Sequence, residues 1–220
     1  MIIRILKVLI GILLLPVAVA TSLSFGAELG EVQNFGGAAG YFLKGVFIYL
    51  IMHLALYKPN YFYVLSHELA HALATFICGG RVSSFRVSSR GGGVLTTKSN
   101  FFIALFPYFF PTYTLFFWLV YFLSSLFRDV SAYTPHFLFL VGFSLTLHLV
   151  MTIQSLKVKQ SDILKTGYLF SVSLIYVLNM LLVSLILSAV FKDFSFAVFF
   201  RSAVERSGSI YYSIYQYWFL

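Results

Sequence analysis

Residues 60–78 read NYFYVLSHELAHALATFIC, an apolar run with two histidines and one glutamate near its centre. Pro59 precedes the run and Gly79-Gly80 follow it, which are typical signals for the start and the end of a helix. His67 and His71 are four positions apart, so they lie on the same face of that helix. The run therefore predicts an apolar helix that presents two imidazoles in one direction.

The composition around this run excludes a soluble globular protein. Of the 220 residues, 60% are hydrophobic and only 10% are charged, and the mean hydropathy is +0.91. An ordinary soluble domain carries about 25% charged residues, so this chain could not cover its surface in water. The same apolar content excludes disorder. We therefore expect an all-α polytopic membrane protein.

Six apolar stretches account for most of the chain, and we expect a single integral membrane domain with about six transmembrane helices. The predicted spans are 2–20, 41–57, 60–78, 101–127, 136–156 and 163–191. The first stretch also resembles a signal peptide, because a basic start is followed by an apolar core and by Ala18-Val19-Ala20; we favour an uncleaved span. The aromatic tail 192–220 is typical of a segment at the level of the lipid headgroups.

The longest polar connection, 79–100, predicts a small β-hairpin at 82–97. Ser84–Ser88 alternates polar and apolar residues as a strand does, and Val94–Thr97 can form the returning strand. Gly91–Gly93 is the expected turn between them. A flexible surface loop is the alternative.

The net charge of +8 is concentrated in short loops, which favours contact with anionic lipid and control of topology over binding of nucleic acid. The positive-inside rule places two loops in the cytoplasm, because together they carry seven basic residues. These residues are Arg81, Arg86, Arg90, Lys98, Lys157, Lys159 and Lys165. Six crossings, however, would put Arg4 and Lys7 on the opposite side, which the same rule disfavours.

His67-Glu68-Leu69-Ala70-His71 is an H-E-x-x-H motif, in which two imidazoles at i and i+4 can hold one zinc ion. Glu68, next to the first histidine, can then act as a general base. A charged side chain in the middle of a bilayer costs on the order of 3 kcal/mol, so these residues are expected to have a function. The only cysteine, Cys78, excludes a site with several thiolates.

A catalytic zinc site needs a third protein ligand. Asp162 is the best candidate, because it joins two apolar runs on the side where the motif helix ends. His148, in the middle of the fifth predicted span, is the second candidate, either as a ligand or as a hydrogen-bonded interior residue. Asn179 and Gln154 are polar groups in apolar runs that could assist the site or join helices by hydrogen bonds.

The motif, the following Gly79-Gly80-Arg81-Val82, the glycine-rich hairpin and the later Asp162 resemble the site-2 protease family of intramembrane zinc metalloproteases, in particular its small members with few extra domains. The resemblance covers roughly residues 60–180. It implies zinc held by His67, His71 and a later aspartate, with Glu68 as the general base. It also implies that an extended substrate segment pairs with a strand of the hairpin.

The leading hypothesis is therefore a zinc-dependent protease that cuts a membrane protein in or near a transmembrane segment. Its partners would be that substrate and the lipid bilayer, without nucleic acid, in the plasma (inner) membrane of a prokaryote. One alternative is an inactive metal-binding scaffold that binds membrane partners. Another is a prenyl-protein or heat-shock type of membrane zinc protease, which takes a glutamate as third ligand; here the only downstream glutamate is Glu205.

Overall fold

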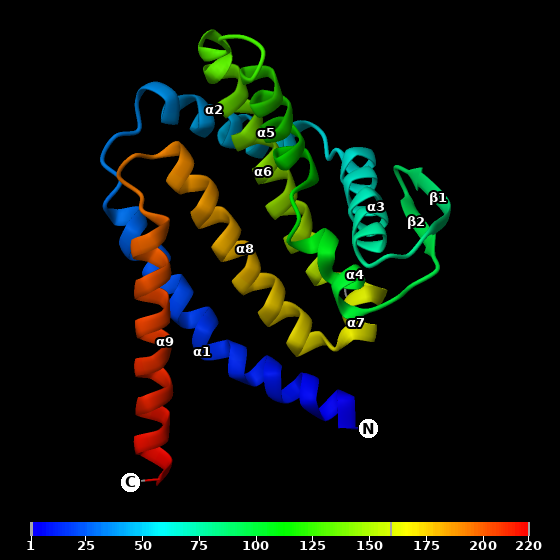
Figure 1. Cartoon of the computed structure of the whole chain (residues 1–220), viewed down its shortest axis with the longest axis vertical. Coiled ribbons are helices and arrows are strands. Elements are labelled where there is room, and N and C mark those ends of the chain that lie inside the picture. The colour runs from blue at the N-terminus through cyan, green and yellow to red at the C-terminus, as the bar shows by residue number, and fades with distance from the viewer. Residues whose placement is uncertain (1, 159, 220) are drawn as a thin grey trace. The chain divides into compact units, whose positions relative to one another are not determined.

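The computed structural model describes residues 2–158 and 160–219, so Lys159 of the basic loop lies outside the described residues. Its contacts divide into two compact units, which are described separately below. One unit joins the chain up to Phe35 with the chain from Ile163 onward, and the other comprises Gly36–Asp162 (Figure 1). The expected single membrane domain stays a prediction.

The first unit consists mainly of three long helices, α1 (Ile2–Gly30), α8 (Tyr168–Val190) and α9 (Phe196–Phe219), with α1 packed against both others. Polar pairs join them: the hydroxyls of Ser22 and Tyr176 are 2.7 Å apart. Helix α1 extends to Gly30, beyond the predicted end at residue 20. The aromatic tail folds as α9, and its place at the lipid headgroups stays a prediction.

In the second unit, α2 (Gly37–Ile51), prolonged by a short π-helix at Met52–Leu56, packs along α6 (Thr134–Lys157). Two glycines make the close approach possible. A Cβ added to Gly45 would lie 2.1 Å from the carbonyl oxygen of Phe139, and one added to Gly142 would lie 2.1 Å from that of Phe42. Small residues commonly allow such backbone contacts between membrane helices.

The predicted stretch 101–127 is a bent pair of helices. α4 (Phe101–Leu105) and a 3₁₀ turn at Phe106–Tyr108 meet α5 (Thr112–Ser125) at an angle of 76°. Pro107 and Pro111 explain the break, because proline interrupts the hydrogen bonds of a helix. The Thr112 side chain donates to the Ser66 carbonyl at 3.2 Å, so the start of α5 is attached to α3 (Asn60–Ile77).

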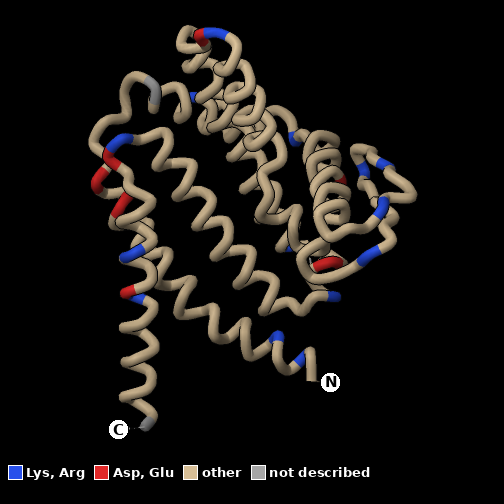
Figure 2. The backbone as a smooth tube through the Cα atoms, in the orientation of Figure 1, with Lys and Arg blue, Asp and Glu red and all other residues tan. Residues whose placement is uncertain are grey.

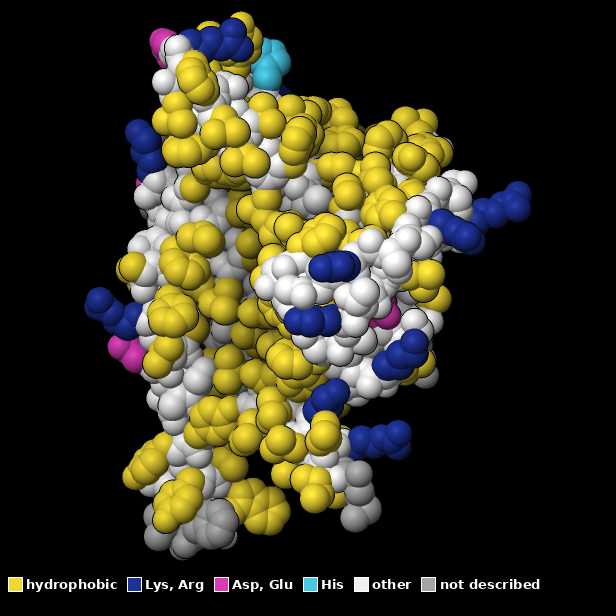
Figure 3. All heavy atoms as spheres, turned by 45° about the vertical axis from the view of Figure 1, so that its right-hand side comes forward, with side chains coloured by type: hydrophobic (Ala, Val, Ile, Leu, Met, Phe, Trp, Pro, Cys, Tyr) yellow, Lys and Arg dark blue, Asp and Glu magenta, His cyan; other side chains and the backbone are white. Residues whose placement is uncertain are grey.

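The predicted β-hairpin is confirmed, with β1 (Val82–Ser88) antiparallel to β2 (Gly91–Thr96). The expected turn at Gly91–Gly93 is wrong: the turn is Ser89-Arg90, and the three glycines belong to β2, paired with Arg86–Ser88. Basic residues lie along the hairpin and its flanks (Figure 2), and they stand out among polar side chains on a face that is otherwise largely hydrophobic (Figure 3).

The structure confirms a helical membrane protein with a small hairpin, but it does not confirm six spans. Within residues 2–158 and 160–219, four helices are long and apolar enough to cross a membrane, or five if the bent pair is one span. α3 is not among them. The stretch 163–191 is also divided, because Gly167, with a φ of +110°, separates α7 (Ser161–Thr166) from α8.

Candidate metal centre

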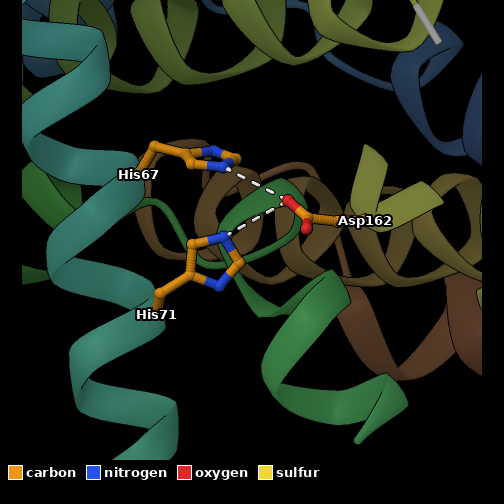
Figure 4. A group of neighbouring side chains, drawn as sticks. All are labelled: His67, His71 and Asp162. Carbon is orange, nitrogen blue, oxygen red and sulfur yellow. Dashed lines mark ion pairs between the residues drawn. The ribbon is translucent and has the colours of Figure 1, made fainter. Parts of the chain in front are cut away.

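Helix α3 presents His67 and His71 in the same direction, as their spacing predicts (Figure 4). Their ring centroids are 4.8 Å apart. The helix begins directly after Pro59 and runs to Ile77, so both histidines lie well inside it, where the backbone is regular. His67 is buried, and the His71 side chain is 14% exposed.

Asp162, at the start of α7, points toward both imidazoles (Figure 4). Its Oδ2 lies 3.5 Å from Nε2 of His71 and 4.0 Å from Nε2 of His67. One donor atom from each of the three residues lies within 4.8 Å of the others. Tetrahedral zinc with bonds near 2.1 Å places its donors about 3.4 Å apart. The arrangement is therefore close to what zinc requires, and the two nitrogens and one carboxylate are ligands it accepts.

The second nitrogen of His71 fixes the orientation of its ring. Nδ1 lies 2.9 Å from the carbonyl oxygen of Ile103 on α4, so an N–H at Nδ1 would leave the Nε2 lone pair directed at Asp162. α4 reaches this carbonyl position because α3 is narrow there: Ala70 and Ala74 pack against Ile103 and Phe106 in one buried cluster. Ala70 and Ala74 thus let α4 approach α3, and this approach brings the Ile103 carbonyl to the His71 ring.

His67 lies among tyrosines. The hydroxyl of Tyr63, one turn earlier on α3, is 3.5 Å from its Nδ1 and forms a short hydrogen bond with the Ser155 hydroxyl on α6. The ring of Tyr108 meets the His67 ring edge to face, with centroids 5.1 Å apart. Tyr108 is fully buried, and its hydroxyl is close enough to Asp162 for an electrostatic interaction. Tyr108 therefore packs its ring on one potential ligand and has its hydroxyl near another.

Glu68 is buried, and together with His67, His71 and Asp162 it lines a cavity of about 500 Å³. The opposite wall is β2, from Gly91 to Val94. Gly92 lies directly against α3: an added Cβ would be 2.8 Å from Glu68 Cγ and 2.8 Å from Val64 Cγ1. The glycine run is thus explained by the close packing of a strand on the helix beside Glu68.

Three other acids have hydrogen-bond partners away from this metal centre. Glu28 accepts a hydrogen bond from the Ser195 N–H at 3.1 Å, and Asp193 accepts one from the Gln33 N–H at 3.4 Å. The N–H and the hydroxyl of Ser131 both donate to Asp129 and hold the pKa of that carboxyl below its ordinary value.

The structure also locates the other polar residues considered from the sequence. His148 is buried on α6 but is not one of the three residues that converge. Gln154 lies 2.8 Å from a ring nitrogen of His53, and Asn179 donates to the Ile175 carbonyl of its own helix. The Gln154 contact joins two helices and the Asn179 contact stays within one helix, so both fit hydrogen bonding within the fold as the alternative to a role in the site.

Sequence reasoning missed Tyr63, Tyr108 and Ser155. Tyr63 is one helical turn before His67, a spacing that places it on the same face and could have been noticed. Tyr108 and Ser155 come from other elements, and no spacing in the sequence connects them to the motif.

The sequence profile of the family described as Peptidase M50B-like matches residues 41–191 of the chain. The match includes α3, the hairpin and Asp162, and it ends just after α8. Neither a curated protein nor a solved structure matches the chain at a significant level.

Proposed function

Because this chain belongs to the M50B-like peptidases, the site-2 protease family of membrane metalloproteases, we propose that it is a zinc-dependent intramembrane endopeptidase. The observation that carries the proposal is the convergence of His67, His71 and Asp162 within 4.8 Å beside the buried Glu68. The substrate would be a membrane protein, cut in or near a transmembrane segment, and the location would be the plasma membrane of a prokaryote.

His67, His71 and Asp162 would hold the metal through Nε2, Nε2 and Oδ2, the three atoms that face one another. When bound, zinc supplies a Lewis acid that polarises the scissile carbonyl and makes a nearby water easier to deprotonate. The Ile103 carbonyl would hold His71 in the required tautomer, since its partner nitrogen is Nδ1.

Glu68 would act first as the general base and then as the general acid. It takes one proton from the attacking water as the water oxygen bonds to the carbonyl carbon, and the C–N bond then breaks. Glu68 returns that proton to the leaving amine, so the carboxylate is regenerated and the sum of the reaction is peptide hydrolysis. The buried position of Glu68 limits the access of bulk water to this step.

β2 would present the substrate. In the described part of the chain the sheet has two strands, so β2 has one edge that is not paired with β1. Residues of β2 line the cavity together with Glu68. An extended substrate segment could add to this edge through main-chain hydrogen bonds, which requires local unwinding of a substrate helix.

The test uses the whole chain, purified in detergent, with a Glu68→Gln variant and a Glu31→Gln control at an exposed residue just after α1. A membrane substrate is incubated with each, and zinc content is measured on the same samples. We expect Glu68→Gln to keep zinc and lose activity by at least about 100-fold, since general acid–base catalysis contributes that much. The control should cleave like the parent.

Two results would count against the proposal. Cleavage by Glu68→Gln at nearly the parental rate would remove Glu68 as the base. Stoichiometric zinc in the parent, without cleavage of any tested membrane substrate, would instead favour the metal-binding scaffold.

A further inference from the structure

A second cavity, of about 310 Å³, lies in the first unit between the start of α1 and the junction of α7 with α8. Three basic residues, Arg4, Lys7 and Lys165, line it together with apolar residues such as Val8 and Leu169. The lining contains no acidic residue. Among the described residues, no ion pair joins any of the three basic side chains to an acid.

The backbone builds this cavity. A Cβ added to Gly11 would lie 2.9 Å from the Phe170 backbone nitrogen, so α1 touches α8 at this point. Lys7, one turn before the contact, packs its stem near Gly167, 3.8 Å from where a Cβ would be. Lys7 is half-buried, so its stem is part of the wall.

The number of crossings decides on which side of the membrane this cavity lies. If α3 does not cross and the bent pair is one span, the described residues cross five times, and the start of α1 is then on the same side of the membrane as the hairpin and Asp162. Lys165 follows Asp162 by three residues, and it lines the same cavity as Arg4 and Lys7. This arrangement removes the conflict that six crossings created, and by the positive-inside rule this side is the cytoplasm.

We propose that this cavity binds the phosphate headgroup of an anionic phospholipid from the cytoplasmic leaflet. Three basic side chains without an acidic partner attract an anion such as a phosphate, and the apolar walls can contact the start of an acyl chain. α1 and α8 are both apolar enough to cross the membrane, so a lipid can reach the cavity from the side. Basic pockets between membrane helices on this side of a bilayer are typical sites for anionic headgroups.

The test measures lipid retention by the whole chain in neutral detergent, using native mass spectrometry with phosphatidylglycerol and with phosphatidylcholine. The variant is Arg4→Gln with Lys7→Gln, and the charge-matched control is Lys192→Gln with Arg201→Gln, which are exposed in the same unit. We expect one tightly held phosphatidylglycerol in the parent and the control. The variant should bind it about 25-fold more weakly, since each of the two basic residues at an anionic surface contributes about fivefold.

Competition with inorganic phosphate and with glycerol phosphate distinguishes the source of the anion. The proposal expects neither to displace the lipid at millimolar concentration; displacement at lipid-like concentrations would identify a soluble phosphate ligand and overturn it. The proposal would also be overturned if the control variant lost as much lipid binding as the Arg4→Gln, Lys7→Gln variant, or if the parent retained phosphatidylcholine as well as phosphatidylglycerol. Either result would show unspecific attraction. If the double variant does not fold, as judged by its melting temperature, the single variant Lys165→Gln is tested instead. The proposal then requires that the parent prefers phosphatidylglycerol to phosphatidylcholine and that Lys165→Gln binds phosphatidylglycerol more weakly. Neither readout depends on proteolysis.

Discussion

Gly92→Ala tests whether contact between β2 and α3 positions Glu68. The new Cβ would lie 2.8 Å from Glu68 Cγ and 2.7 Å from the Arg86 carbonyl oxygen. An ordinary carbon–carbon contact is about 3.5–4.0 Å, so Glu68 or the strand must move by about 1 Å. The Arg86 oxygen is backbone of the paired strand and cannot rotate away, which leaves the side chains of Glu68 and Val64, and β2 itself, as the groups that move.

The expected effect follows from that displacement. Overpacking costs about 1–3 kcal/mol of stability. A misplacement of about 1 Å at a catalytic group can cost about 100-fold in rate. We therefore expect a modest fall in melting temperature, a fall in cleavage rate of about 10- to 100-fold, and unchanged zinc content, because Glu68 is proposed as a base and not as a ligand.

Gly93→Ala is the matched control, since nothing lies within 4 Å of a Cβ at that position. The assay compares cleavage of one membrane substrate, zinc content and thermal unfolding for both variants in the same detergent. If Gly92→Ala cleaves within twofold of Gly93→Ala, the contact does not position Glu68 and the reasoning fails.

Asp162→Ala should reduce zinc stoichiometry after gentle chelation while His148→Ala retains it; the reverse result would transfer the third ligand to His148. Tyr108→Phe keeps the ring against His67 but removes the hydroxyl beside Asp162, so we expect zinc affinity or turnover to fall about 10-fold, and unchanged values for both would exclude a positioning role. Gly45→Ala would place a Cβ 2.1 Å from a carbonyl oxygen of α6, and it should lower the melting temperature clearly, whereas Gly26→Ala, with nothing within 4 Å, should not.

Local patterns were sufficient for most of the elements. Apolar runs predicted the helices, because each such run must satisfy its own backbone hydrogen bonds in lipid. Alternation predicted the hairpin, and the prolines at 107 and 111 explain the break between α4 and α5. The i and i+4 spacing predicted that His67 and His71 share a face. All of these depend on the period of a single element, which a sequence displays directly.

Hydropathy alone left the number of spans open. The run at 60–78 was predicted as a span, but α3 is not among the described helices that are long and apolar enough to cross a membrane, so this span stays a prediction. Gly91–Gly93 was taken for a turn because glycine favours turns, whereas the run lies in a strand whose position against α3 leaves no room for a side chain at Gly92.

The sequence by itself indicated the membrane class and a helical motif whose two histidines share a face, since composition and spacing are local properties. It pointed to Asp162 only through the position of this residue between two apolar runs. Tertiary structure decided that Asp162 faces both histidines, that the Ile103 carbonyl holds His71, and that Tyr108 packs on His67 with its hydroxyl near Asp162. These residues come from different elements, and only packing, which depends on shape across the whole unit, brings their atoms within a few ångströms.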